Sequence, residues 1–156
     1  MMLKFFKDIF LPENDENTKG NYQSDEKKIQ IATCALFLEV ANSDDELSKV
    51  EKKEIFKIMK KLFDLEDECV SELIHLSNEQ IENSVSLYEF TDVINQSFDE
   101  NHKYEIIKNL WRLIYSDEEL SPYEESFIKK ITGNFHLTHY DLINAKLEVK
   151  EELGLK

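Results

Sequence analysis

The chain carries one acidic stretch twice, as Ser43-Asp44-Asp45-Glu46-Leu47-Ser48-Lys49-Val50-Glu51 and as Ser116-Asp117-Glu118-Glu119-Leu120-Ser121-Pro122-Tyr123-Glu124. The second copy begins 73 residues after the first, and six of the nine positions are identical. Each copy follows one apolar run with helical spacing and precedes another, which indicates a duplicated helix–elbow–helix unit. We call residues 43–48 the first elbow and residues 116–121 the second. Two repeats are too few for a solenoid, so we expect the copies to close on each other about a pseudo-twofold axis.

The rest of the chain shows the same helical spacing of apolar residues. Three glycines and two prolines leave few turn residues for hairpins, whereas the abundant Leu, Glu and Lys favour helices. Ser77-Asn78-Glu79-Gln80 has the form of a capping box and predicts a possible break within one helix. We predict an all-α protein. The expected helices cover residues 25–42, 49–63, 66–84, 86–97, 99–116, 122–135 and 139–152.

Two segments precede the predicted bundle. Residues 1–10 place Leu3, Phe6 and Phe10 on one face of an amphipathic helix. Residues 11–24 are polar and rich in turn formers, which is typical of a linker. We expect the helical domain to span residues 25–153. The amphipathic segment has two interpretations, docking onto this domain or contact with a membrane surface or a partner.

Charge and cysteine spacing limit the classes of function. The formal net charge of −14 argues against a nucleic-acid partner, because binding to phosphates needs a basic face. Cys34 and Cys69 have neither disulfide-framework nor zinc spacing and indicate a reducing compartment. No apolar run reaches the roughly 18–20 residues that span a bilayer, and no signal peptide is recognisable. We therefore predict a cytoplasmic protein, with residues 1–10 as a candidate peripheral contact to the membrane.

The elbows combine capping signals with an excess of carboxylates. Ser48 with Glu51, and Ser121 with Glu124, have capping-box spacing, which requires no further function. Capping does not explain the acidic triplets, which follow a helix C-terminus where negative charge costs about 0.3–1 kcal/mol per residue. A hard cation, Ca²⁺, Mg²⁺ or Mn²⁺, would offset their repulsion. The candidate ligands are Asp44, Glu46, Asp117 and Glu119, and elbows that are only solvated caps are the other interpretation.

Several motifs, in order over about residues 25–150, are similar to those of one known family. They are Ala35-Leu36-Phe37-Leu38-Glu39-Val40-Ala41 before the first elbow, Leu87-Tyr88-Glu89-Phe90-Thr91, Leu110-Trp111-Arg112-Leu113-Ile114-Tyr115 before the second elbow, and His136-Leu137-Thr138-His139-Tyr140-Asp141. The chain resembles the TerB-like family, the tellurite-resistance B proteins, whose superfamily includes the N-terminal domain of the DjlA co-chaperone. That family usually has Asp-Gly-Glu at each elbow, whereas Asp45 and Glu118 replace the glycine here.

The resemblance implies a compact bundle of seven or eight helices made of two similar halves, no established catalytic activity, and a link to tellurite and general stress responses at the inner membrane. Our first hypothesis is a non-enzymatic module whose elbows bind a divalent cation or a basic partner. The second is a co-chaperone-type or scaffold domain that docks a protein without binding metal. A metal-dependent hydrolase would additionally need an open coordination position beside a pocket. The oligomeric state is not predicted by the sequence.

A few further side chains have predicted positions. Glu39 and Arg112 occupy equivalent sites in the two copies, one turn before each elbow, and we expect them to form a buried ion pair. Trp111 and Tyr115, and Tyr88 and Phe90, are expected in the core. No nucleophile with a matched base is visible, so no covalent catalysis is predicted.

Overall fold

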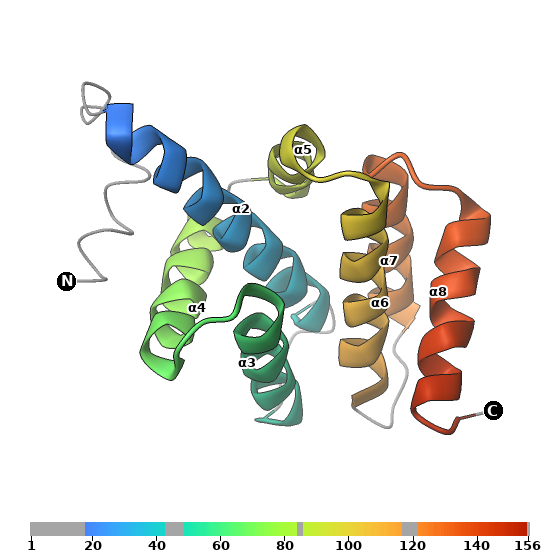
Figure 1. Cartoon of the computed structure of the whole chain (residues 1–156). Helices are drawn as coiled ribbons and strands as arrows, with labels where there is room; N and C mark the ends of the chain where they lie inside the picture. Colours follow the sequence, from blue (N-terminus) through green and yellow to red (C-terminus); the bar gives the residue numbers. More distant parts are fainter. Residues whose placement is uncertain (1–17, 43–48, 84–85, 117–121, 156) are drawn as a thin grey trace.

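The computed structural model describes residues 18–42, 49–83, 86–116 and 122–155, with side chains from Glu26 onward. Every regular element in these ranges is a helix, so the all-α prediction is confirmed (Figure 1). All predicted boundaries agree within two residues except the start of the first helix. The helices are α2 (Thr18–Ala41), α3 (Lys49–Phe63), α4 (Asp67–Glu82), α5 (Leu87–Ser97), α6 (Glu100–Ser116), α7 (Pro122–Asn134) and α8 (His139–Glu152).

Helix α2 begins at Thr18, earlier than the predicted residue 25, so residues 18–24 of the expected linker are helical. The linker prediction relied on turn formers such as Gly20. A glycine inside a helix costs only about 1 kcal/mol, and extending an existing helix is much easier than starting one. The proposed division into an N-terminal segment, a linker and a domain otherwise stays a prediction.

Helix α2 lies at the centre of the first half of the chain. From Gln30 to Ala41 every side chain except Glu39 is buried, so this C-terminal half of the helix is covered on all sides. It packs chiefly against α4 and α5, and it also contacts α3, α6 and α7. A helix that is apolar all round is stable only when it is surrounded in this way. In Figure 1 it runs diagonally across the molecule, with α3 and α4 on one side of it.

The predicted break at Ser77 does not occur, because α4 is continuous through this residue. Ser77 is buried, and its hydroxyl donates to the Leu73 carbonyl at 2.7 Å and lies 3.3 Å from the Ile31 carbonyl of α2. Back-bonding within the helix thus replaces the expected cap. Ser77 also hydrogen-bonds to Cys34, whose pKa is raised to about 12 because its thiol is fully buried.

The second half of the chain places α6, α7 and α8 beside one another (Figure 1). Trp111 of α6 is 2 % exposed, and its indole N–H donates to the Leu142 carbonyl of α8 at 3.1 Å. Its ring stacks on Tyr115 with centroids 5.9 Å apart, and the Lys146 ammonium lies 5.3 Å from the ring centroid. These contacts fix α8 on α6. Of the predicted aromatic core residues, Trp111 and Phe90 are buried, but Tyr88 is exposed and that prediction was wrong.

A buried lysine joins three helices. Lys103 of α6 donates to Asn95 Oδ1 of α5 and to the Phe135 carbonyl after α7, both at 3.1 Å. Asn95 in turn donates to the Asn134 carbonyl at 2.8 Å. Carbonyls at a helix C-terminus lack partners within the helix, so a cation there is favourable.

The two halves have helices at corresponding positions. Helices α3 and α7 begin 73 residues apart, the offset between the two acidic stretches. Helix α2 packs on α4 as well as on α5, and α6 packs on α8 as well as on α3. A pseudo-twofold axis relating the halves stays a prediction. Within the described ranges, no helix is both long and apolar enough to cross a membrane.

Candidate functional site

The predicted cation ligands fall outside the described residues. Asp44 and Glu46 lie in residues 43–48, and Asp117 and Glu119 lie in residues 117–121. The structure does place the helices that flank them: the first elbow joins α2 to α3, and the second joins α6 to α7. The candidate ligand sets therefore stay predictions, each located between two defined helix ends.

The glutamate that follows each elbow is buried. Glu51 in the first turn of α3 is 2 % exposed, and Glu124 in the first turn of α7 is 1 % exposed. Each also forms an interaction within the structure. A buried carboxylate is costly unless it is hydrogen-bonded, paired or bound to a cation. Both halves therefore hold a desolvated carboxylate at the same place, next to the predicted ligands.

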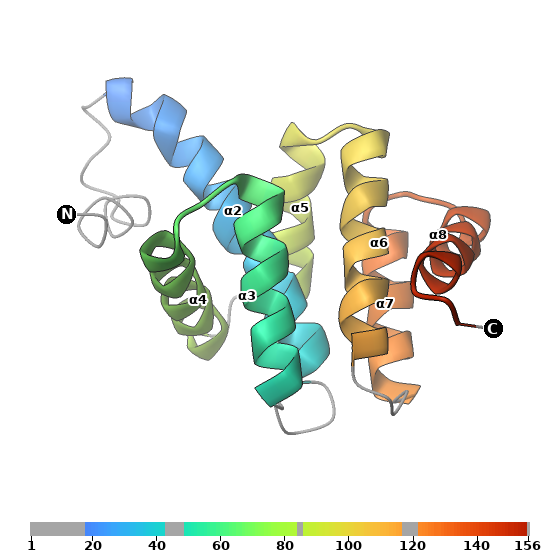
Figure 2. The ribbon, with the colours of Figure 1, turned by 60° about the horizontal axis from the view of Figure 1, so that its bottom comes forward.

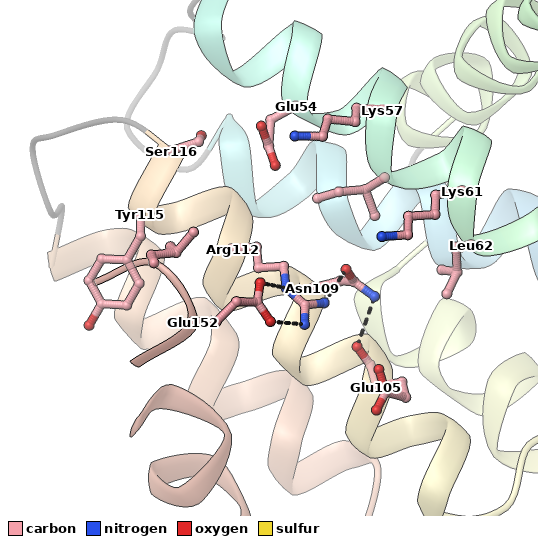
Figure 3. Close-up of a pocket in the computed structure, with 12 residues that line it drawn as sticks. Glu54, Lys57, Lys61, Leu62, Glu105, Asn109, Arg112, Tyr115, Ser116 and Glu152 are labelled. Carbon is pink, nitrogen blue, oxygen red and sulfur yellow. Dashed lines mark hydrogen bonds and ion pairs between the residues drawn. The ribbon is translucent and has the colours of Figure 1, made fainter. Parts of the chain in front are cut away.

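A cleft of about 590 Å³ opens between α3, α6 and the end of α8 (Figure 3). Its charged lining consists of three basic and three acidic residues, and Ile58, Leu62 and Leu153 supply apolar surface. Lys57 and Lys61 come from α3, whereas Arg112 comes from α6. The acidic residues are Glu54, Glu105 and Glu152.

Arg112 is bound by the end of α8. Its Nε and Nη2 donate to the two carboxylate oxygens of Glu152 at 2.7 and 2.8 Å, and its Nη1 donates to Asn109 Oδ1 at 2.7 Å (Figure 3). The hydrogen bond and charge of Glu152 raise the pKa of the Arg112 guanidinium, and Arg112 in return lowers the pKa of the Glu152 carboxyl. This bidentate pair fixes α8 against α6 at the floor of the cleft.

The predicted ion pair between Glu39 and Arg112 does not form. The carboxylates that act on Arg112 are Glu152, Glu105 and Glu54, and burial alone raises the pKa of the Glu39 carboxyl. The prediction assumed that equivalent positions meet across the pseudo-axis. It overlooked Glu152, which α8 brings to Arg112 from 40 residues away in sequence.

A second polar cluster lies between α6 and α8. Tyr104 donates to Glu148 Oε2 at 3.0 Å and accepts from Asn144 at 2.8 Å, and Lys108 lies 3.2 Å from the other Glu148 oxygen. Partial burial and the Glu148 carboxylate raise the pKa of Tyr104 to about 12, so its hydroxyl stays protonated at neutral pH. These contacts add to the attachment of α8.

The lining of the cleft contains charged, amide, hydroxyl and apolar side chains. Its lining includes no His or Cys, and its Ser116 hydroxyl donates to the Leu113 carbonyl at 2.6 Å. Among the described residues no group of three or more His, Cys, Asp or Glu side chains is arranged to hold a metal ion. His136 and His139, which flank the start of α8, are both exposed.

Comparison with known proteins identifies the family. The family profile described as tellurite resistance protein TerB matches residues 30–147, which is most of the chain. The chain belongs to the TerB family. That family is generally non-catalytic. Among curated proteins, no sequence matches the chain.

The TerB-like fold also occurs in a solved structure. A crystal structure of a protein of unknown function from Porphyromonas gingivalis W83 matches with a TM-score of 0.60 and 16% sequence identity. The match covers 80% of this chain and 95% of that protein. At this identity the likeness shows the fold alone.

Proposed function

We propose that the protein is a non-enzymatic TerB-like module of a tellurite, metal or general stress response. In this proposal the two elbows bind a divalent cation, Ca²⁺, Mg²⁺ or Mn²⁺, or a basic partner. Asp44 and Glu46 are the ligands of the first elbow, and Asp117 and Glu119 are those of the second. The module acts in the cytoplasm and meets its partner at the inner-membrane face, with residues 1–10 as the peripheral contact.

The observation that carries this proposal is the burial of Glu51 and Glu124, each directly after an elbow. Together with the elbow carboxylates they complete an Asp-x-Glu-x₄-Glu spacing in both halves. Oxygen-rich sets of this kind suit hard cations. A bound cation would also reduce the repulsion among the elbow carboxylates. The formal net charge of −14 increases this repulsion.

Calorimetric titration with Ca²⁺ and with Mn²⁺ tests the proposal. We expect the wild-type protein to bind with a dissociation constant in the range of about 10⁻⁴–10⁻³ M, as for weak oxygen-ligand sites. Asp44→Asn with Glu46→Gln should remove one site, and Asp117→Asn with Glu119→Gln should remove the other. Glu100→Gln with Glu151→Gln is the matched control, because it removes the same charge from exposed positions on α6 and α8. No heat at millimolar cation would refute cation binding.

A second set of variants separates coordination from capping. Glutamine replaces glutamate in a capping box with little loss, but it is a much weaker cation ligand. Glu51→Gln and Glu124→Gln should therefore leave thermal stability nearly unchanged and weaken cation binding. Unchanged cation binding would assign these two glutamates to capping alone.

The alternative function is a co-chaperone-type or scaffold domain whose elbows are only helix caps. The observation that favours it is a set of tyrosines that are at least 64% exposed, Tyr88, Tyr123 and Tyr140. Exposed aromatic residues are enriched at protein interfaces. Under this alternative the cation titration gives no heat, and replacing the three tyrosines by serine abolishes capture of a partner from the native host.

A further inference from the structure

The solvent face of α3 is made of lysines. This 15-residue helix has six lysines and two glutamates, although the whole chain has a formal net charge of −14. Glu51 is buried with Ile55, Ile58 and Met59 on the opposite side, so it does not offset the exposed charge at the surface. All six lysines are exposed, and we call them the basic face: Lys49, Lys52, Lys53, Lys57, Lys60 and Lys61.

The neighbouring helix has the opposite charge. Helix α4 is 16 residues long and contains five acidic residues and no lysine or arginine. Its buried side consists of Val70, Leu73, Leu76 and Ser77, so the acidic residues lie on the rest of its circumference. We call them the acidic face: Asp67, Glu68, Glu72, Glu79 and Glu82.

Few of these charges are paired within the molecule. Across the two helices the described contacts contain one ion pair, Lys60 Nζ to Asp67 Oδ1 at 2.7 Å. Glu79 meets His75 of its own helix at 3.3 Å. The other lysines of the basic face and the other carboxylates of the acidic face make no ion pair within the described residues. Lys57 and Lys61 also line the cleft beside α6, where the charge of Lys61 helps to lower the pKa of Glu152.

The helices that carry the two faces lie side by side. Both helices pack against α2, so their solvent faces are directed away from it, and they contact each other (Figure 2). Where they meet, an open hollow of about 560 Å³ is lined by Phe56 and Leu65 together with charged residues of both helices. The surface of α3 and α4 therefore has the basic face on one helix and the acidic face on the other, with Phe56 and Leu65 exposed to the hollow near the turn that joins them.

We propose that this α3–α4 surface binds a second copy of the same chain. In the proposed dimer the twofold axis lies in the interface and runs along the two helices. A rotation about this axis places α3 of each copy against α4 of the other. Such an isologous contact needs a self-complementary patch, which adjacent strips of opposite sign and similar length provide. A nucleic acid or an anionic membrane would match the basic face alone and would be repelled by the acidic face beside it.

Salt concentration should control this dimer. At about 0.1 M salt the net repulsion between two anionic copies is screened beyond about 10 Å, while charges in contact still attract. At about 1 M salt the screening length is about 3 Å, so the contact attraction is also lost. We expect sedimentation velocity of the full chain to show dimer at the lower salt concentration. The dissociation constant should rise at least about tenfold at the higher one.

A charge exchange tests which surfaces meet. The basic-face variant combines Lys49→Glu, Lys53→Glu and Lys60→Glu, which do not line the cleft, and the acidic-face variant combines Glu68→Lys, Glu72→Lys and Glu82→Lys. Each variant alone should be monomeric, because both of its helices then have the same sign. Mixed in equal amounts, they should form a heterodimer, because opposite signs again meet in both contacts.

Lys129→Glu with Lys130→Glu and Lys150→Glu is the matched control, since it changes net charge as much as the basic-face variant does. This control should dimerise like the wild-type protein, and circular dichroism verifies that every variant folds. A wild-type protein that is monomeric at both salt concentrations would overturn the proposal. A mixture of the two variants without heterodimer would also overturn it. Binding of the monomer to RNA or to anionic vesicles through the basic face would assign that face to a different partner.

Discussion

Helices α2 and α6 occupy corresponding places in the two halves, yet one is covered all round and the other borders a cleft. On α2 the positions Ala32, Ala35 and Leu36 are buried, with Glu39 half-buried beside them. The positions 73 residues later are Glu105, Lys108, Asn109 and Arg112, which face the cleft or α8. The same helix position can therefore serve as core in one half and as a polar surface in the other.

The difference shows that the polar surface is confined to one of these two helices. Helix α5 packs on α2, whereas α3 and α8 flank the polar face of α6 without closing the cleft. The helices themselves keep their length and order because their buried faces are retained, for example Ile55 and Ile128. Two experiments compare positions 73 residues apart, and two compare Glu39 with Glu152, the expected and the observed partner of Arg112.

The largest effect is expected at Leu36 and its counterpart Asn109. Leu36→Ala leaves a cavity in the closed core and should lower the free energy of unfolding by about 3 kcal/mol. Asn109→Ala removes the hydrogen bond from Arg112 and should cost about 1 kcal/mol. Urea unfolding measures both. Equal losses would mean that the cleft face is as tightly packed as the core.

A second comparison concerns the buried polar residues Gln30 and Lys103, also 73 residues apart. Lys103→Met leaves the oxygens of Asn95 and Phe135 without their donor and should lower the free energy of unfolding by about 2 kcal/mol. Gln30 Oε1 accepts no hydrogen bond in the structure, so Gln30→Leu should stabilise the protein by about 1 kcal/mol. The two variants should thus shift the thermal midpoint in opposite directions. Destabilisation by Gln30→Leu would indicate an ordered water at that oxygen.

Double-mutant cycles compare the observed and the expected partners of Arg112. The cycle of Arg112→Ala with Glu152→Ala should give a coupling energy of about 1 kcal/mol, because the pair is bidentate but partly exposed. The cycle of Arg112→Ala with Glu39→Ala should give a coupling of about zero. A strong coupling energy between Arg112 and Glu39 would mean that the ion pair expected from the repeat does form.

The smallest expected effects are the changes in stability with pH. They have opposite signs for Glu39 in the first half and Glu152 in the second. Burial raises the pKa of Glu39, so on raising the pH the unfolded chain loses its proton first and stability falls. Arg112 lowers the pKa of Glu152, so its contribution is present above the unfolded pKa and is lost as the pH falls through the folded pKa.

At about pH 7, Glu39→Gln should therefore stabilise the protein and Glu152→Gln should destabilise it, each by about 0.5 kcal/mol. As the pH is lowered toward about 2 both differences should shrink, because the two carboxyls become protonated and lose their charge. Thermal unfolding between these pH values measures the effect. A pH-independent difference would assign it to packing instead of charge.

The helices could be predicted from local sequence because their signals are local. Ser86 and Thr138 cap α5 and α8 as expected, and α8 ends before Gly154, whose φ of 74° suits a residue without a side chain. The start of α2 was missed because turn formers such as Gly20 lower helix propensity only weakly. Ser77 was misinterpreted because its burial against α2 is decided by tertiary packing.

The cleft could not be predicted, because its residues come from three helices that are distant in sequence. Nothing near Arg112 in the sequence indicates Glu152, and the pairing follows from the attachment of α8 through Trp111. The lysine spacing of α3 was visible in the sequence. The net charge of −14 did not indicate a basic helix, because the sum over the whole chain does not describe the charge of one helix.

The position of Trp111 gives this protein a built-in optical reporter. It is the single tryptophan of the chain, and it lies between α6 and α8 in contact with Tyr115 and Lys146. The fluorescence of Trp111 therefore reports whether α8 is packed on α6, whereas far-ultraviolet circular dichroism reports the average helix content of the whole chain. Monitoring both signals during denaturation would reveal whether the last helix detaches before the remainder of the bundle melts.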